Sequence, residues 1–77
     1  MAMPGDVLTM WSVYDHPSDY PDAFVARKFE ARGGITVATS DMFTAPTLNE
    51  LRRLLPPGLV CFPRNPDDDP VIVETWL

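Results

Sequence analysis

The residue best placed for chemistry is His16, which lies between Asp15 and Pro17 in a stretch that also holds Asp19 and Asp22. An imidazole beside carboxylates can act as a general base or help to bind a metal. The same residues are typical of a turn, because Asp accepts backbone hydrogen bonds and Pro fixes the bend. We favour the turn. A ligand site on the Asp15–Asp22 loop is the alternative.

If such a ligand site exists, the arginines are its natural anion-binding groups, since a guanidinium can clamp a carboxylate or phosphate with two hydrogen bonds. The candidate ligand-binding residues are then Asp15, His16, Tyr20, Arg27 and Arg64. The simpler interpretation of the strand charges is a cross-strand ion pair of Arg27 with Glu74, which contributes little when exposed.

Cys61 and His16 form the single Cys/His combination in the chain that could support nucleophilic catalysis. However, Cys61 lies between Val60 and Phe62 in a strand-like run, where a small buried core residue is the natural expectation. No catalytic residue is therefore predicted, and an enzyme is the less favoured class.

The acidic run Asp67–Asp69 could attract a hard cation, but it lacks the spaced oxygens and the glycine of a calcium loop. We predict an exposed hairpin tip there. One cysteine and one histidine cannot supply the usual structural zinc set, so no metal and no cofactor are expected.

The 77-residue length predicts one small domain, whose stability is marginal without good packing or self-association. The net charge is −5, from eleven acidic and six basic residues, and the basic residues are dispersed. A phosphate backbone repels such a surface, so nucleic acid is disfavoured as a partner. No apolar run approaches the length of a membrane span, and we expect a cytoplasmic protein without a membrane partner.

The most clearly predicted element is a helix over Thr47–Leu55. Thr47 and Glu50 have the spacing of a capping box, and Pro56 follows as a stop signal. The apolar residues at helical spacing, expected on one face, are Leu48, Leu51, Leu54 and Leu55. So short a helix must lie on an apolar surface.

The rest of the chain predicts strands, and the order is β-β-β-α-β-β. Alternating and β-branched stretches suggest strands at Met10–Tyr14, Ala23–Ala31, Ile35–Asp41, Leu59–Pro63 and Pro70–Leu77. The pair Gly33–Gly34 predicts a tight hairpin between the second and third strands. The fold class is therefore α+β, an antiparallel sheet of four or five strands with one short helix on one face. Residues 1–9 are expected to be a disordered extension and residues 10–77 a single domain, with Met10 as a possible translation start.

Several stretches together resemble a group of short bacterial proteins of unknown function. The pattern consists of W-x-V-Y-D-H-P at Trp11–Pro17, D-Y-P at Asp19–Pro21 and F-V-A-R at Phe24–Arg27, with further similarity at Leu54–Leu59, Pro63–Arg64 and Pro70–Glu74. The resemblance covers nearly the whole chain after residue ten. It implies a bacterial origin and no particular mechanism.

The leading functional hypothesis is a non-catalytic binding or protein-interaction module, with a homodimer or another protein as its partner. The second strand has apolar residues on both faces, which suits a sheet with a helix on one side and a partner, or the chain's own tail, on the other. The large aromatic residues also exceed what one short helix can cover, so that Trp76, Phe24 or Tyr14 is expected to be exposed. The alternative is a small-ligand or metal-binding protein, or an enzyme, using the Asp15–Asp22 loop with Arg27 or Arg64.

Overall fold

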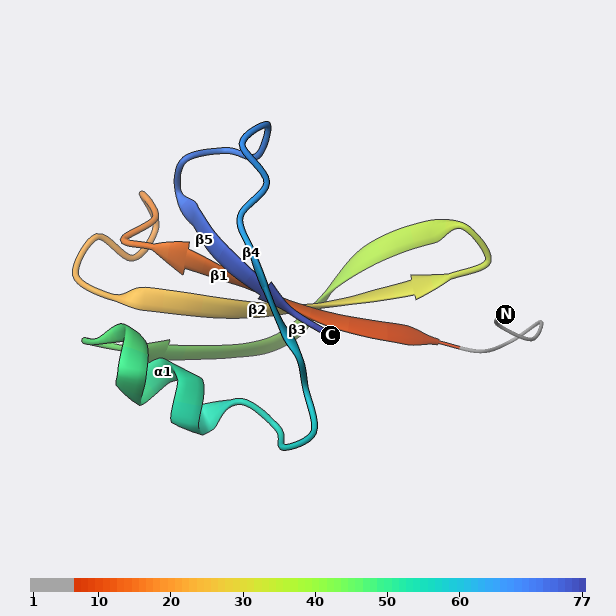
Figure 1. Cartoon of the computed structure of the whole chain (residues 1–77), viewed down its shortest axis with the longest axis horizontal. Helices are drawn as coiled ribbons and strands as arrows, with labels where there is room; N and C mark the ends of the chain where they lie inside the picture. The colour runs from red at the N-terminus through yellow and green to blue at the C-terminus, as the bar shows by residue number, and fades with distance from the viewer. Residues whose placement is uncertain (1–6) are drawn as a thin grey trace.

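A computed structural model describes residues 7–77 as a twisted five-stranded antiparallel sheet with one short helix (Figure 1). The elements are β1 (Leu8–Asp15), β2 (Phe24–Arg32), β3 (Ile35–Ala45), α1 (Leu48–Leu54), β4 (Cys61–Pro63) and β5 (Ile72–Trp76). The strand order is β3-β2-β1-β5-β4, so that β1 is the central strand and β3 and β4 are the edges. The predicted α+β class and element order are confirmed.

The N-terminal boundary differs from the prediction. β1 begins at Leu8, because Leu8 and Thr9 pair with Ala31 and Glu30 of β2. The expected disordered extension over residues 1–9 is therefore too long by at least these two residues. Its first six positions lie outside the described residues.

The β2–β3 hairpin turns at Gly33 and Gly34, as predicted. Both glycines have positive φ angles, of 58° and 82°, which residues with a Cβ adopt with strain. In Figure 1 the closed end of this hairpin extends away from the part of the sheet that α1 covers.

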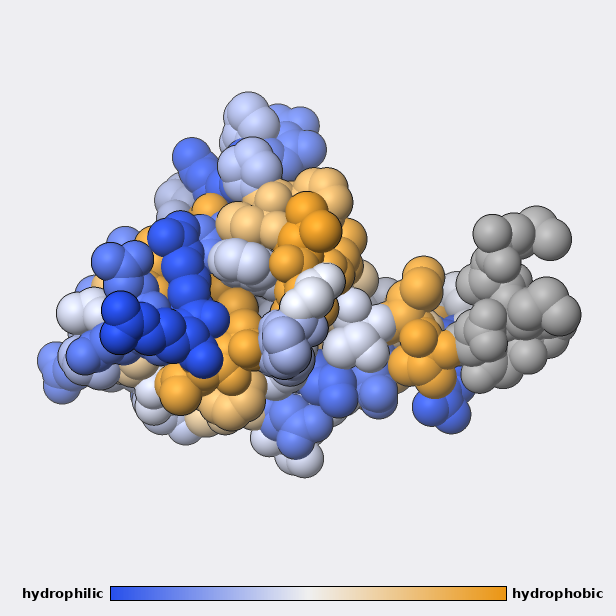
Figure 2. All heavy atoms as spheres, turned by 60° about the horizontal axis from the view of Figure 1, so that its bottom comes forward, coloured by the Kyte–Doolittle hydropathy of each residue, from blue (hydrophilic) through white to orange (hydrophobic). Residues whose placement is uncertain are grey.

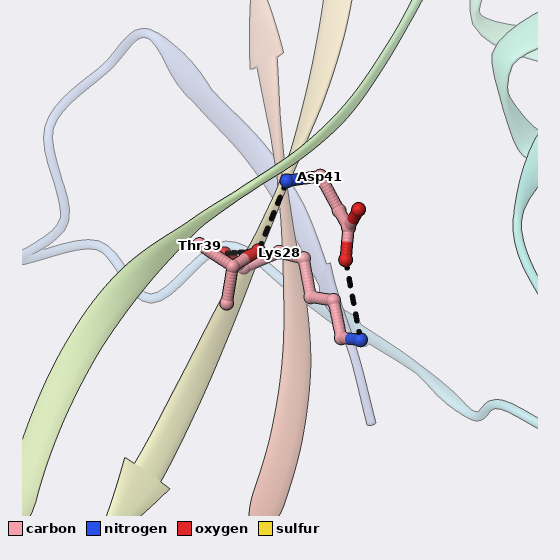
Figure 3. Close-up of polar contacts among 3 residues, drawn as sticks. All are labelled: Lys28, Thr39 and Asp41. Carbon is pink, nitrogen blue, oxygen red and sulfur yellow. Dashed lines mark hydrogen bonds and ion pairs between the residues drawn. The ribbon is translucent and has the colours of Figure 1, made fainter.

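The edge strand β3 continues to Ala45, past the predicted end at Asp41, because a bulge lets it bend and keep pairing with β2. Figure 3 shows how side chains fix this bulge. The Thr39 hydroxyl donates to the Lys28 carbonyl at 3.2 Å and accepts from the Asp41 backbone N–H at 3.1 Å. The Lys28 ammonium lies 3.5 Å from the Asp41 carboxylate.

The helix begins and ends close to the predicted positions. The Thr47 hydroxyl caps it by accepting the Glu50 N–H at 3.2 Å, and the chain leaves the helix at Leu55 in an extended conformation before Pro56. Leu51 and Leu55 are buried, but Leu54 is 47% exposed. The prediction that all four leucines share the buried face is thus wrong for Leu54, which lies at the side of the helix.

The core fills the space between α1 and one face of the sheet. Its buried members are Trp11, Val13, Ala26, Ala45, Leu51 and Leu55, and Phe24, Phe43, Leu48, Leu59, Val73 and Trp76 pack around them. The Trp11 and Phe43 rings stack with centroids 5.1 Å apart. We call this side of the sheet the helix face, and the opposite side the open face.

The strand register assigns each side chain to one of these faces, because residues directly opposite one another in an antiparallel pair project to the same side. Trp11 faces Lys28 and Trp76, and Val13 faces Ala26 and Glu74. All of these positions therefore belong to the helix face, and the residues between them along each strand belong to the open face.

Candidate functional site

An apolar row crosses β3, β2 and β1 on the open face and continues at the residues that flank β5 and β4. Met10 pairs with Phe29, and Phe29 pairs with Ala38. On the other side of Met10, the last β1–β5 pair is Trp11 with Trp76, and Leu77 follows Trp76 by one residue, which puts it on the open face. Leu77 exchanges backbone hydrogen bonds of 2.8 and 3.0 Å with Val60. We call these five residues, Ala38, Phe29, Met10, Leu77 and Val60, the apolar row.

The apolar row is exposed at the two residues that flank β4 and β5. Val60 is 59% exposed and Leu77 is 48% exposed, and the neighbouring Phe62 of the same face is also 48% exposed. The large hydrophobic residues that reach solvent are Leu8, Tyr20, Ile35, Val37, Leu54, Val60, Phe62 and Leu77. Figure 2, turned so that the side on which α1 lies comes forward, shows several apolar patches between hydrophilic ones.

The open face carries almost no charge. Among its paired strand positions in the described part of the chain, Arg27 is the single ionisable residue with a charge at neutral pH. The Arg27 guanidinium forms an ion pair with Asp19 of the β1–β2 loop. An apolar surface whose one charge is already neutralised suits contact with another protein better than binding of a free anion.

Asp15, the last residue of β1, contacts its sequence neighbour His16, the first residue of the β1–β2 loop. The His16 ring is hydrogen-bonded to the Asp15 carboxylate, and both side chains are about half exposed, at 43% and 53%. His16 has a φ of 48° and its ring contacts Phe24 edge-on at 4.9 Å. The loop itself is closed by backbone hydrogen bonds, including His16 N–H to Ala23 at 3.0 Å, as the predicted turn requires.

The five candidate ligand-binding residues do not form one cluster. Asp15 pairs with Phe24 and so belongs to the helix face, whereas Arg27 belongs to the open face. Tyr20 is 37% exposed in the loop between them. Arg64 lies in the β4–β5 loop, exposed and without an ion pair in the described residues. A ligand site that uses Asp15 and Arg27 together therefore has no support from the register.

The acidic run Asp67–Asp69 forms the predicted exposed hairpin tip. Its carboxylates accept backbone N–H groups: Asp68 accepts from Asn65 at 3.1 Å and Asp69 accepts from Val71 at 3.0 Å. No group of three or more potential metal-ligating side chains occurs within residues 7–77.

A polar cluster that joins the helix to the sheet was not predicted. Glu74 is only 4% exposed on the helix face, and Arg52 of α1 donates to its two carboxylate oxygens at 3.0 and 2.5 Å. The indole N–H of Trp76 donates to the same carboxylate at 2.6 Å. The predicted pair of Arg27 with Glu74 is wrong, because the two residues lie on opposite faces of the sheet.

The Arg52 hydrogen bonds lower the pKa of Glu74. Burial acts in the opposite direction, and the Trp76 N–H lowers the pKa further. The same contact with Glu74 raises the pKa of Arg52. The Glu74 carboxylate is therefore charged at neutral pH, and its oxygens accept hydrogen bonds from Arg52 and Trp76. These contacts give Glu74 a structural role.

Acidification is expected to weaken this cluster and destabilise the protein. The folded pKa of Glu74 lies below its unfolded value of about 4.3, so between the two values the unfolded chain binds more protons. The contribution of Glu74 is present above about pH 4.3 and is lost as the pH falls towards the folded pKa. Urea unfolding from neutral to acidic pH measures this loss. The Glu74→Gln variant should show a flatter pH dependence, and a slope equal to that of the wild type would contradict the assignment.

Cys61 is exposed, and the prediction of a buried core residue is wrong. It pairs with Trp76 at the edge of the sheet, where β4 is only three residues long and cannot cover it. Partial desolvation of the thiol, and next the Glu74 carboxylate, raise the pKa of Cys61. The thiol is thus kept protonated, which is the opposite of what a nucleophile needs.

The exposed rings also differ from the expected ones. Trp76 and Phe24 are partly buried against the core, and Tyr14 is half-buried on the open face. Phe62 and Tyr20 are the exposed aromatic residues instead. The sequence shows that Phe62 and Cys61 lie on opposite faces of β4. It does not show which of these faces meets the core.

The fold and the open face together define a small α+β domain with a helix on one face of its sheet. No protein-family model matches the chain, and no curated protein or solved structure matches it either. Within the described residues no helix is long and apolar enough to cross a membrane.

Proposed function

We propose that this protein is a non-catalytic interaction module and that its open face binds another polypeptide. The observation that supports this most is the apolar row, which leaves Val60 and Leu77 59% and 48% exposed beside Phe62. Burial of exposed apolar surface is the dominant favourable term in most protein association. We propose the cytoplasm as its compartment, because a free exposed thiol such as that of Cys61 stays reduced there.

The chemistry of the polar groups supports a binding role over catalysis. Glu74 is occupied by Arg52 and Trp76, and Arg27 is paired with Asp19. The Cys61 thiol has a raised pKa. The Asp15–His16 pair of the alternative ligand site is held within its own turn and faces away from Arg27. A ligand site or an enzyme in this loop therefore has less support.

Two valine variants test the proposal, because the chain offers a matched pair. Val60 on the open face and Val37 on the helix face are 59% and 56% exposed. Val37 pairs with Glu30, which fixes its side of the sheet. A lysine at either position adds the same charge to a residue outside the core, so both variants should fold like the wild type.

The experiment is size-exclusion chromatography of the labelled protein in a lysate of its source cells. The wild type and Val37→Lys are expected to elute above the mass of the 8.6 kDa monomer, and Val60→Lys is expected to elute as a monomer, because a lysine cannot be buried unpaired. If all three proteins elute alike, the open face is not a binding surface.

A further inference from the structure

We infer that the polypeptide bound by the open face is a second copy of this chain, with the two sheets packed face to face as a sandwich. This inference rests on the proposed function and names its partner.

The distribution of charge over the surface favours contact between two copies through their open faces. Two chains of net charge −5 repel one another through most of their surfaces. The charged strand residues Lys28, Glu30 and Glu74 lie on the helix face, and the acidic run lies in the β4–β5 loop. The paired strand side chains of two open faces meet without like-charge contacts, because Arg27 is the single charged residue among them and is already paired with Asp19.

The edges of the sheet are poor places for strand pairing between copies. β4 has three residues and ends at Pro63, which has no backbone N–H to donate. β3 is long, but its bulge interrupts the edge, and the Asp41 N–H is already bonded to the Thr39 hydroxyl. Bulges and short edge strands are devices that prevent edge pairing. A copy is therefore expected on the open face.

The core of a single chain is small for an independent domain. The buried apolar residues among those described are Trp11, Val13, Val25, Ala26, Ala45, Leu51 and Leu55, of which two are alanines. Domains of this size commonly gain stability by association. A copy of the chain satisfies this need without any other gene product, and it would bury the apolar row of both chains at once.

The area of the open face is sufficient for a moderate dimer. Five strands at about 4.8 Å spacing give a width of about 24 Å, and the open-face positions of β1 from Leu8 to Tyr14 span roughly 20 Å. Two such faces bury at most about 1,000 Å², near the lower limit for specific interfaces, because Val25 of this face is already fully buried within the single chain. Association in the micromolar range is the expected strength.

The strand order also places the centre of the contact. β1 is the central strand, and Met10 is the middle residue of the apolar row. Sheets that pack face to face lie about 10 Å apart with their strands within about 30° of each other. A two-fold axis between the sheets at the centre of the row brings Met10 of one copy next to Met10 of the other.

Sedimentation equilibrium of the purified full chain, from about 1 µM to about 1 mM, tests this inference. The wild type is expected to form dimers, Val37→Lys to match it, and Val60→Lys to raise the dimer dissociation constant by at least about tenfold. The dissociation constant should not rise when salt is increased, since the paired strand side chains of the open face include no unpaired charge. Amide NMR spectra of each variant confirm that it is folded.

Three outcomes overturn the inference, and they differ in what they say about the proposed function. If the purified wild type stays monomeric while Val60→Lys still abolishes complex formation in the lysate, the open face binds a different protein. If Val60→Lys changes neither measurement, the proposed function fails as well. Equal weakening by Val37→Lys and Val60→Lys would show that added charge, and not the open face, controls association.

Discussion

Leu51→Ala is expected to lower the free energy of unfolding by about 3 kcal/mol. The Leu51 side chain is fully buried between α1 and the helix face of the sheet. Its truncation removes apolar contacts and leaves a cavity that a small, tightly packed domain fills poorly. Because a chain of this length has a total stability of about 4 to 12 kcal/mol, the urea midpoint should fall substantially.

Leu54→Ala is the matched control, since the same truncation is made in the same turn of the same helix. Leu54 is 47% exposed, and the expected loss is below about 1 kcal/mol. Urea unfolding followed by tryptophan fluorescence measures both variants. Comparable losses for Leu51→Ala and Leu54→Ala would mean that α1 does not pack on the sheet through the face described.

Arg52→Ala is expected to destabilise the protein by about 2 to 3 kcal/mol, the second largest effect. The substitution leaves the Glu74 carboxylate, 5% exposed, with the Trp76 N–H as its remaining side-chain donor among the hydrogen bonds described. The loss is below that of a fully buried pair because Arg52 itself is 40% exposed, and water can replace part of its contact.

Arg53→Ala removes the adjacent arginine of the last turn, which is exposed, and should change the stability by less than about 0.5 kcal/mol. Both variants lower the charge of the helix end equally, so the difference between them isolates the contact with Glu74. An equal effect of the two substitutions would assign the loss to the helix dipole instead.

The local structure could be predicted where a short stretch of sequence determines it. Thr47 and Pro56 bound the helix, and Gly33–Gly34 form the hairpin turn, because capping and positive φ depend on neighbouring residues alone. The strand ends could not be placed as well. β3 continues to Ala45 only because the bulge at Thr39 and Asp41 keeps it paired with β2.

The candidate site depends on long-range register, which one sequence does not contain. A strand has two faces, and the alternation of Val60, Cys61 and Phe62 does not say which of them meets the core. Cys61 was therefore expected inside and is exposed. The same lack of register led to the prediction of an Arg27 pair with Glu74, although the two lie on opposite faces.

The general form of the site was nevertheless present in the sequence. Apolar residues on both faces of the second predicted strand favoured a sheet whose second side is covered by a partner or by the chain's own tail. The structure adds that Met10, Phe29 and Ala38 align across three strands, and that Leu77 and Val60 extend this row to the other edge.

The most direct test of the account is the solvent accessibility of the Val60 and Val37 methyl groups, measured by NMR relaxation with a soluble paramagnetic probe as the protein concentration is raised. In the dilute protein both valines should be relaxed by the probe, since both are more than half exposed. At high concentration the Val60 methyl groups are expected to become protected from the probe, because the dimer buries the open face, while those of Val37 stay accessible. Val60 remaining as accessible as Val37 at every concentration would contradict it.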